Sequence, residues 1–198
     1  LPTDADVTAP KTPLDLTMGE HCDLLVLCET LRVARSLPTV SKYPVAALPV
    51  RSAWLAMSDR LSRRATFSFV TPTELRDAVG YWRRALETPV LIDWPSLAAK
   101  GTSPTSELTG AATNRPWAAA LDGVLRPLGL GWAPIHGGAV WIASAERVAR
   151  ERSIALYPGD EAEPAMRIAA GVRDPVSGAA IVLASPAEHR QIAAELGR

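Results

Sequence analysis

The sequence predicts an α+β fold built from small strand–helix units. Apolar residues make up 47% and charged residues 21% of the 198 residues, a composition typical of a globular protein with a real core. Along the chain the apolar spacing switches between the period of a strand and that of a helix. Ser/Thr-x-x-Glu signals, which start helices, follow several of the extended stretches. We therefore expect a β-α-β-β-α-β-β unit and then a β-α-β-β-α unit, preceded by a helical N-terminal segment.

The expected boundaries follow from changes in this pattern. Residues 1–16 hold three prolines and no apolar period, and they are predicted to be a flexible tail. Residues 17–64 are predicted to be the helical N-terminal segment. The first strand–helix unit is expected over residues 65–148 and the second over residues 152–198.

Two helices are predicted within the N-terminal segment. Thr17 and Glu20 form a capping box, after which apolar residues continue at helical spacing up to Pro38. The residues on this apolar face are Leu24, Leu27, Cys28 and Leu31. A proline-rich connection separates this helix from a second one, expected over residues 50–63.

The first unit should open with a strand over residues 65–70. Thr71-Pro72-Thr73-Glu74 then reads as a capping box with Pro72 as the first helical residue, where its missing N–H costs nothing. The inward face of this helix is predicted to be Leu75, Val79, Trp82 and Leu86. A second strand is expected over residues 89–94.

The rest of this unit is predicted to be a strand, a helix and a hairpin. The strand covers residues 107–112, and the helix begins at Pro116. The residues expected to face inward from that helix are Trp117, Leu121, Val124, Leu125 and Leu128. His136-Gly137-Gly138 is a hairpin signal between strands at 130–135 and 139–143, because glycine tolerates the positive φ of a tight turn.

The second unit should repeat this logic. A short strand over residues 154–157 precedes a helix that Asp160 and Glu163 would cap and that carries Met166 and Ala169. Residues 174–178 are typical of a turn and precede a strand over 179–184. Ser185-Pro186-Ala187-Glu188 then caps a final helix, with Pro186 as its first residue.

This pattern resembles a known family. Residues 65–143, with the extended Ala65–Val70, the Pro89–Trp94 strand and the apolar run from Ala120 to Leu130 that closes on a Gly-turn hairpin, resemble the short N-terminal domain of secretins and TonB-dependent receptors. Residues 154–196 are similar to the small β-α-β-β-α modules of secretins. The resemblance implies a periplasmic or cell-envelope protein whose domains dock other proteins or form rings. It implies no catalytic residue, and residues 18–64 match no part of it.

The sequence carries no familiar signature of catalysis or cofactor binding. It has no Gly-rich phosphate loop, CxxC pair, HExxH or GxSxG, and we expect no cofactor. A Ser/His/Asp site could still be assembled from distant positions. Of the histidines in the two units, His136 is expected to be a solvated turn residue and His189 a surface residue of the last helix.

The charge and hydropathy of the chain limit the classes of molecule that it is expected to bind. Lys+Arg and Asp+Glu both number 21, so the chain lacks the basic surplus that binds nucleic acid or anionic lipid. No apolar run approaches the ~20 residues of a membrane helix, so we expect no transmembrane segment. A protein partner of unknown identity is the expectation, and the sequence leaves the oligomeric state open.

The tryptophans are the candidate contact residues. Trp82 and Trp117 are expected in the core, on helix faces. If Val140 and Ile142 face inward, strand alternation places Trp141 on the outside. The alternative is that Val140 faces out and Trp141 covers a second layer of helices. An exposed Trp141 beside Trp132 or Trp94 would form an adhesive patch suited to protein or sugar.

Three functional hypotheses remain. The first is a non-catalytic interaction or assembly module of the cell envelope. The second is a small-ligand or glycan-binding protein that uses the exposed tryptophans, and the third is an unrecognised hydrolase. A deep pocket in which His136 or His189 meets a carboxylate and a serine would favour the hydrolase.

The two cysteines yield the first testable prediction. Cys22 and Cys28 lie six residues apart in a predicted helix, which turns them to different faces, so they should not be bonded to each other. With His21 they match no zinc pattern. Thiol counting under denaturing, non-reducing conditions should find free thiols in monomeric protein, and finding none would contradict the assignment.

Overall fold

The computed structural model describes residues 52–135 and 138–197. Helices and strands alternate along the chain, which confirms the α+β class. Among the described residues, the two largest hydrophobic clusters lie one in each strand–helix unit, and a smaller one lies beneath α7. The predicted tail, the capping box at Thr17 and the first predicted helix lie outside the described residues.

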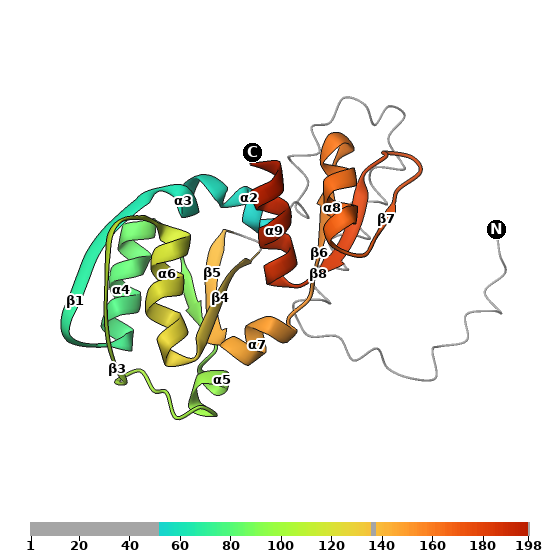
Figure 1. The fold of residues 1–198 in the computed structure, drawn as a ribbon. Helices are drawn as coiled ribbons and strands as arrows, with labels where there is room; N and C mark the ends of the chain where they lie inside the picture. The colour runs from blue at the N-terminus through green and yellow to red at the C-terminus, as the bar shows by residue number, and fades with distance from the viewer. Residues whose placement is uncertain (1–51, 136–137, 198) are drawn as a thin grey trace, which may run out of the picture.

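The first unit contains two small sheets, and it begins before residue 65 because Trp54 and Leu61 join its core. Its elements are α2 (Ala53–Ala56), α3 (Ser58–Ser62), β1 (Arg64–Glu74), α4 (Leu75–Leu86), β2 (Val90–Ile92), α5 (Trp94–Ala98), β3 (Glu107–Pro116), α6 (Trp117–Leu125), the 3-10 helix η3 (Arg126–Leu128), β4 (Leu130–Ile135), β5 (Ala139–Ser144) and α7 (Ala145–Arg150). Strands β1 and β3 form an antiparallel pair. The other sheet has the order β2-β5-β4, with β2 parallel and β4 antiparallel to β5. Helices α4 and α6 stand between the two sheets (Figure 1).

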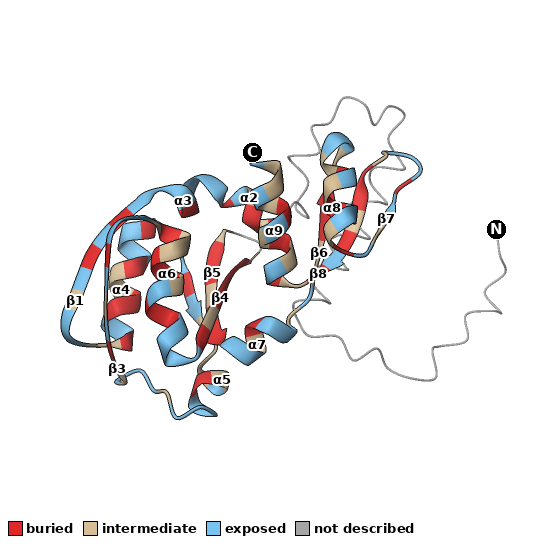
Figure 2. Ribbon diagram, in the orientation of Figure 1, coloured by how far each residue is buried: buried red, intermediate tan, exposed pale blue. Residues whose placement is uncertain are grey.

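The predicted helix faces form the first core. All four residues predicted on the inward face of α4 are buried, with exposed fractions of 3% or less. Trp117, Leu121, Val124 and Leu125 of α6 are buried as predicted, and Figure 2 shows the two helices turning their buried sides inward. The prediction for Leu128 was wrong. Pro127 cannot continue an α-helix, so α6 ends at Leu125 and Leu128 lies exposed in η3.

The capping box predicted at Thr71 was also wrong. Strand β1 continues to Glu74, and its pairing with β3 shifts between Phe69 and Thr73, so that the stretch containing Pro72 bulges out of the ladder. A bulge on an edge strand tolerates proline because no ladder N–H is needed there. Helix α4 begins at Leu75 without a side-chain cap. Carbonyls of the loop before β3 accept hydrogen bonds from its first N–H groups instead, Ser106 O from Leu75 N at 2.8 Å and Pro104 O from the next N–H at 3.0 Å.

Two further boundaries differ from the predictions. The single helix expected over residues 50–63 is broken at Met57 into α2 and α3. Trp94 belongs to α5 rather than to a strand, because the carboxylate of Asp93 accepts a hydrogen bond from Ser96 N and starts a helix there. The hairpin strands β4 and β5 lie where they were predicted.

The second unit is a three-stranded sheet with two helices. It comprises β6 (Ser153–Tyr157), the 3-10 helix η4 (Gly159–Glu161), α8 (Ala162–Ile168), β7 (Gly171–Arg173), β8 (Ala180–Ala184) and α9 (Pro186–Leu196). The sheet order is β6-β8-β7, and both pairings are antiparallel. Residues of β6, β8, α8 and α9 share the second core. The capping box expected at Asp160 and Glu163 was wrong, because the η4 turn leads into α8 and no side chain caps it.

The turn before β8 and the cap of α9 are as predicted. The carboxylate of Asp174 accepts hydrogen bonds from the backbone N–H and the hydroxyl of Ser177, which closes the turn. Ser185 and Glu188 form a complete capping box, and Pro186 is the first residue of α9. These hydrogen bonds to Ser185 hold the pKa of Glu188 below its ordinary value.

A polar–aromatic cluster joins the two units. Arg190 of α9 forms an ion pair of 2.7 Å with Asp122 of α6. The other carboxylate oxygen of Asp122 accepts a hydrogen bond of 2.8 Å from the Trp132 indole N–H. The Arg190 guanidinium lies 5.3 Å from the ring centroid of Trp54 and 5.7 Å from that of Trp132. One arginine therefore contacts three side chains of the first unit.

The two Ser/Thr-Pro-x-Glu sequences form a matched pair for mutation. Ser185→Ala should lower the free energy of unfolding by about 1 kcal/mol, because α9 loses its N-cap. Thr71→Ala should change it by less than about 0.5 kcal/mol, since this exposed strand residue caps nothing. Urea denaturation of both variants checks the difference, and equal losses would contradict the corrected start of α4.

Candidate interaction surface

The direction of the side chains on the central strand β5 determines whether Trp141 lies at the surface. Val140 and Ile142 are fully buried against the first core, as the alternation argument required. Trp141 therefore points to the other side of the β2-β5-β4 sheet, where it is half-buried. In register with it lie Leu91 on β2 and Ala133 on β4. These three side chains form an apolar row across the outer face of the sheet.

Helix α7 covers only part of this outer face. Its Val148 packs with Ala133 and Ala143, and Trp141 lies against this small cluster. The helix approaches closely because β4 has a glycine there, since a Cβ on Gly131 would lie 3.2 Å from atoms of Ala145 and Val148. The other end of the row stays open. Leu91 is 47% exposed, unusual for a leucine in a strand.

An arginine lies against the aromatic ring. The Arg147 guanidinium is 5.8 Å from the ring centroid of Trp141, within range of a cation–π contact. Ion pairs to Glu151 at 3.1 Å and to Asp93 at 3.8 Å hold it there. Trp141 therefore presents its remaining surface beside a fixed, half-buried cation.

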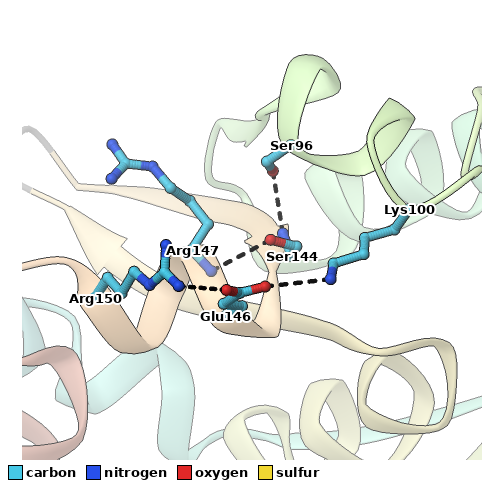
Figure 3. Close-up of polar contacts among 6 residues, drawn as sticks. All are labelled: Ser96, Lys100, Ser144, Glu146, Arg147 and Arg150. Carbon is cyan, nitrogen blue, oxygen red and sulfur yellow. Dashed lines mark hydrogen bonds and ion pairs between the residues drawn. The ribbon is translucent and has the colours of Figure 1, made fainter.

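A network of polar contacts borders the apolar row on the side of α5 (Figure 3). Glu146 on α7 binds Lys100, at 3.2 Å, and Arg150. The hydrogen bond from Lys100 is the main reason that the pKa of Glu146 is lowered. Ser144 caps α7 by accepting from Arg147 N, and its own N–H donates to the Ser96 hydroxyl. These bonds tie α5, β5 and α7 together.

The other two candidate tryptophans do not join this surface. Trp132 pairs with Ile142 on the inner side of the sheet and is only 6% exposed. Trp94 packs from α5 against the first core. The patch of neighbouring tryptophans does not form. Sequence reasoning missed Leu91, although its position between the inward-facing Val90 and Ile92 could have revealed it.

His189 is not the surface residue that was predicted. It is 2% exposed, because α9 turns this side chain toward the sheet of the second unit. Its Nε2 lies 3.0 Å from the Ser153 carbonyl, which only accepts, so Nε2 carries the proton and Nδ1 accepts from the Tyr157 hydroxyl at 2.7 Å. Burial raises the pKa of Tyr157 to about 12. His136 lies outside the described residues.

A cleft of about 390 Å³ lies at the junction of the two units. Its lining includes Trp54, Trp132, Asp122 and Arg190. Asp122 and Arg190 are paired with each other and hold the two units together, and both tryptophans are more than nine-tenths buried. Arg126 and Ser185 also line the cleft.

No protein-family model and no curated protein matches the chain. Among residues 52–135 and 138–197, no group of three or more His, Cys, Asp or Glu side chains is placed to hold a metal ion. No helix in that same part of the chain is long and apolar enough to cross a membrane.

The burial difference between two tryptophans on one sheet can be measured. Trp132→Ala should cost about 3–5 kcal/mol of unfolding free energy, because it empties a core site and removes the donor to one oxygen of Asp122. Trp141→Ala should cost no more than about 1–2 kcal/mol, because its ring is only partly buried and lies outside the first core. Chemical denaturation followed by circular dichroism distinguishes them. A loss at Trp141 as large as that at Trp132 would exclude it as a surface contact.

Proposed function

We propose that this chain is a non-catalytic protein-interaction module of the cell envelope, with the outer face of the β2-β5-β4 sheet as its contact surface. The observation that carries the proposal is the apolar row of Leu91 and Trp141, which α7 leaves partly open. Tryptophan and arginine are among the residue types most enriched at the residues that contribute most of the binding energy of interfaces.

The charged groups around the row favour a protein partner that is not strongly charged. Three carboxylates and three cations of α5, α7 and the adjoining residues pair with one another, so this group carries no net charge. They are Asp93, Glu146 and Glu151 with Lys100, Arg147 and Arg150. An apolar centre within a polar, self-paired rim is the usual anatomy of a reversible protein interface. Binding should then come from buried apolar area and depend little on salt.

The cell-envelope location rests on the resemblance to secretin and TonB-receptor domains. The elements from β1 to β5 follow the order expected for such a unit, with α5 as an additional helix. The second unit follows with β6-α8-β7-β8-α9, again in the expected order. This order supports the envelope assignment, and a periplasmic location is part of the same proposal.

The described residues give less support to the other two hypotheses. A glycan site built from several tryptophans would need them on one face, and Trp132 and Trp141 lie on opposite faces of the sheet. A hydrolase of the Ser/His/Asp type would need a histidine free to activate the serine. Both ring nitrogens of His189 already have partners, a tyrosine hydroxyl and a backbone carbonyl.

A site-specific cross-linking experiment tests the proposed contact surface. A photo-reactive amino acid at Leu91 should yield a discrete protein adduct in cells of the source organism. The same group at Val70, an 83% exposed residue on β1, serves as the matched control and should not yield that adduct. Adding Trp141→Ala to the Leu91 probe should weaken the adduct severalfold, because it removes the largest apolar side chain of the row.

Salt provides the second arm of this experiment. Raising ionic strength from about 0.1 M to 0.5 M should leave the Leu91 adduct almost unchanged, since apolar contacts are not screened. An adduct that appears equally at Val70, or that disappears with added salt, would contradict the proposal. So would a Leu91 adduct that is insensitive to Trp141→Ala.

A further inference from the structure

The cleft at the junction of the two units lies along an open strand edge. Strand β4 is the last strand of its sheet, with β5 as its neighbour on one side only. Leu125 of α6 lines the cleft from the inner side of this sheet, and Ala149 of α7 lines it from the outer side. Pro186 and Ala187 at the start of α9 form the wall from the second unit. The cleft of about 390 Å³ therefore has walls from both units.

The backbone of β4 contributes polar groups to the cleft. Ala145 N donates to Gly129 O at 2.9 Å, next to the first pair of the β4-β5 ladder. Bonds between antiparallel strands recur at every second residue, so Leu130 and Trp132 turn their N–H and C=O groups away from β5. Both residues line the cleft, so one wall of it carries backbone donors and acceptors.

The rest of the cleft has an apolar floor and a mouth of short side chains. The buried apolar side chains of its lining, each at most 9% exposed, include Trp54, Leu125, Leu130, Trp132 and Val148. The exposed residues that α7 and α9 contribute to the lining are Ala145, Ala149 and Ala187. Because alanine has no side chain beyond Cβ, the two helices leave the floor open to a ligand. The volume lies within the ~300–1,000 Å³ typical of small-molecule sites.

Guanidinium groups outnumber carboxylates in this cleft. Arg126 and Arg190 both line it, and Asp122 is the one carboxylate among its described lining residues. Arg190 binds Asp122 through Nη2 at 2.7 Å, which neutralises that carboxylate. Arg126 is exposed in η3, and within residues 52–135 and 138–197 no carboxylate forms an ion pair with it. The lining therefore carries one positive charge in excess, which favours an anion.

We propose that this cleft binds a small organic acid that has a flat apolar body and one acid group. The apolar body packs on Trp132 and Val148, and the acid group pairs with Arg126 at the rim. The volume suits a small molecule rather than a folded partner, whose interface would be a broad surface of about 800 Å² on each side. The site is independent of the proposed protein contact, because Leu91 lies on β2 at the opposite edge of the sheet.

Two fluorescent probes that differ in charge test this site in the full chain. Anilinonaphthalene sulfonate has an aromatic body and an acid group, and phenylnaphthylamine has the same body without the charge. Fluorescence titration should show saturable binding of both probes. Arg126→Gln should weaken the sulfonate probe about fivefold and leave the neutral probe unchanged, because it removes only the charge. Arg84→Gln, which changes an exposed arginine of α4, is the matched control and should affect neither probe.

A variant that fills the cleft provides the second arm of this experiment. Ala149→Leu should weaken both probes severalfold, because its side chain takes the space of the apolar body. Ala85→Leu, at an exposed position of α4, is the matched control and should leave both affinities unchanged. Leucine is a strong helix former, so neither variant should unfold its helix, and thermal unfolding checks this.

Four results would overturn the proposal. They are the lack of saturable binding of either probe, unchanged affinities in Ala149→Leu, and equal effects of Arg126→Gln and Arg84→Gln on the sulfonate probe. The fourth is probe binding that is lost in Trp141→Ala but kept in Ala149→Leu, because the probes would then lie on the outer face of the β2-β5-β4 sheet.

Discussion

The need to bury Val140 and Ile142 governs the arrangement of the first unit. Strand β5 lies in the middle of its sheet, and its inward residues complete a core with α4 and α6. Because side chains alternate along a strand, burying these two residues forces Trp141 outward. The pairing of β5 with β2 and β4 then aligns Leu91 with it in one row. The proposed contact surface is thus a consequence of how the core is packed.

One carboxylate, that of Asp122, makes polar contacts with both units. Asp122 uses one oxygen for the Trp132 indole and the other for Arg190 of α9, so neither oxygen is left unpaired in a partly buried place. The aromatic rings of Trp54 and Trp132 lie within cation–π range of the same guanidinium. Helix α9 in turn starts where the Ser185 capping box fixes it. The N-terminal cap of α9 therefore also helps to position Arg190 for its contact with the first unit.

The sequence predicted the periodic elements well and the special ones poorly. The faces of α4 and α6 and the hairpin strands β4 and β5 follow from apolar spacing alone. The sequences beginning at Thr71 and Ser185 look alike, yet only the second caps a helix. Pairing with β3 extends β1 past Thr71, and such long-range strand pairing leaves no trace in a four-residue window. Local signals fail where distant backbone supplies the hydrogen bonds.

The burial of side chains that combine an apolar ring with a polar nitrogen was the least predictable feature. His189 and Trp132 both carry polar nitrogen atoms, and sequence alone did not show which would find buried partners. Tyr157, 32 residues from His189, and Asp122, 10 residues from Trp132, supply those partners inside the protein. Trp141 was predictable in direction because its orientation depends only on its immediate neighbours. Its half-burial was not, because that depends on α7 and Arg147.

The length of α7 explains why the surface around Leu91 remains open. A six-residue helix is about 9 Å long, whereas three strands with six residues in the longest measure about 10 Å by 20 Å. Such a helix can shield only one end of the face, and Gly131 draws it to the end that carries Val148. Chain that continues into β6 after Arg150 cannot extend the cover. The open end, with Leu91 and part of Trp141, is then the part of this sheet that a second protein could still bury.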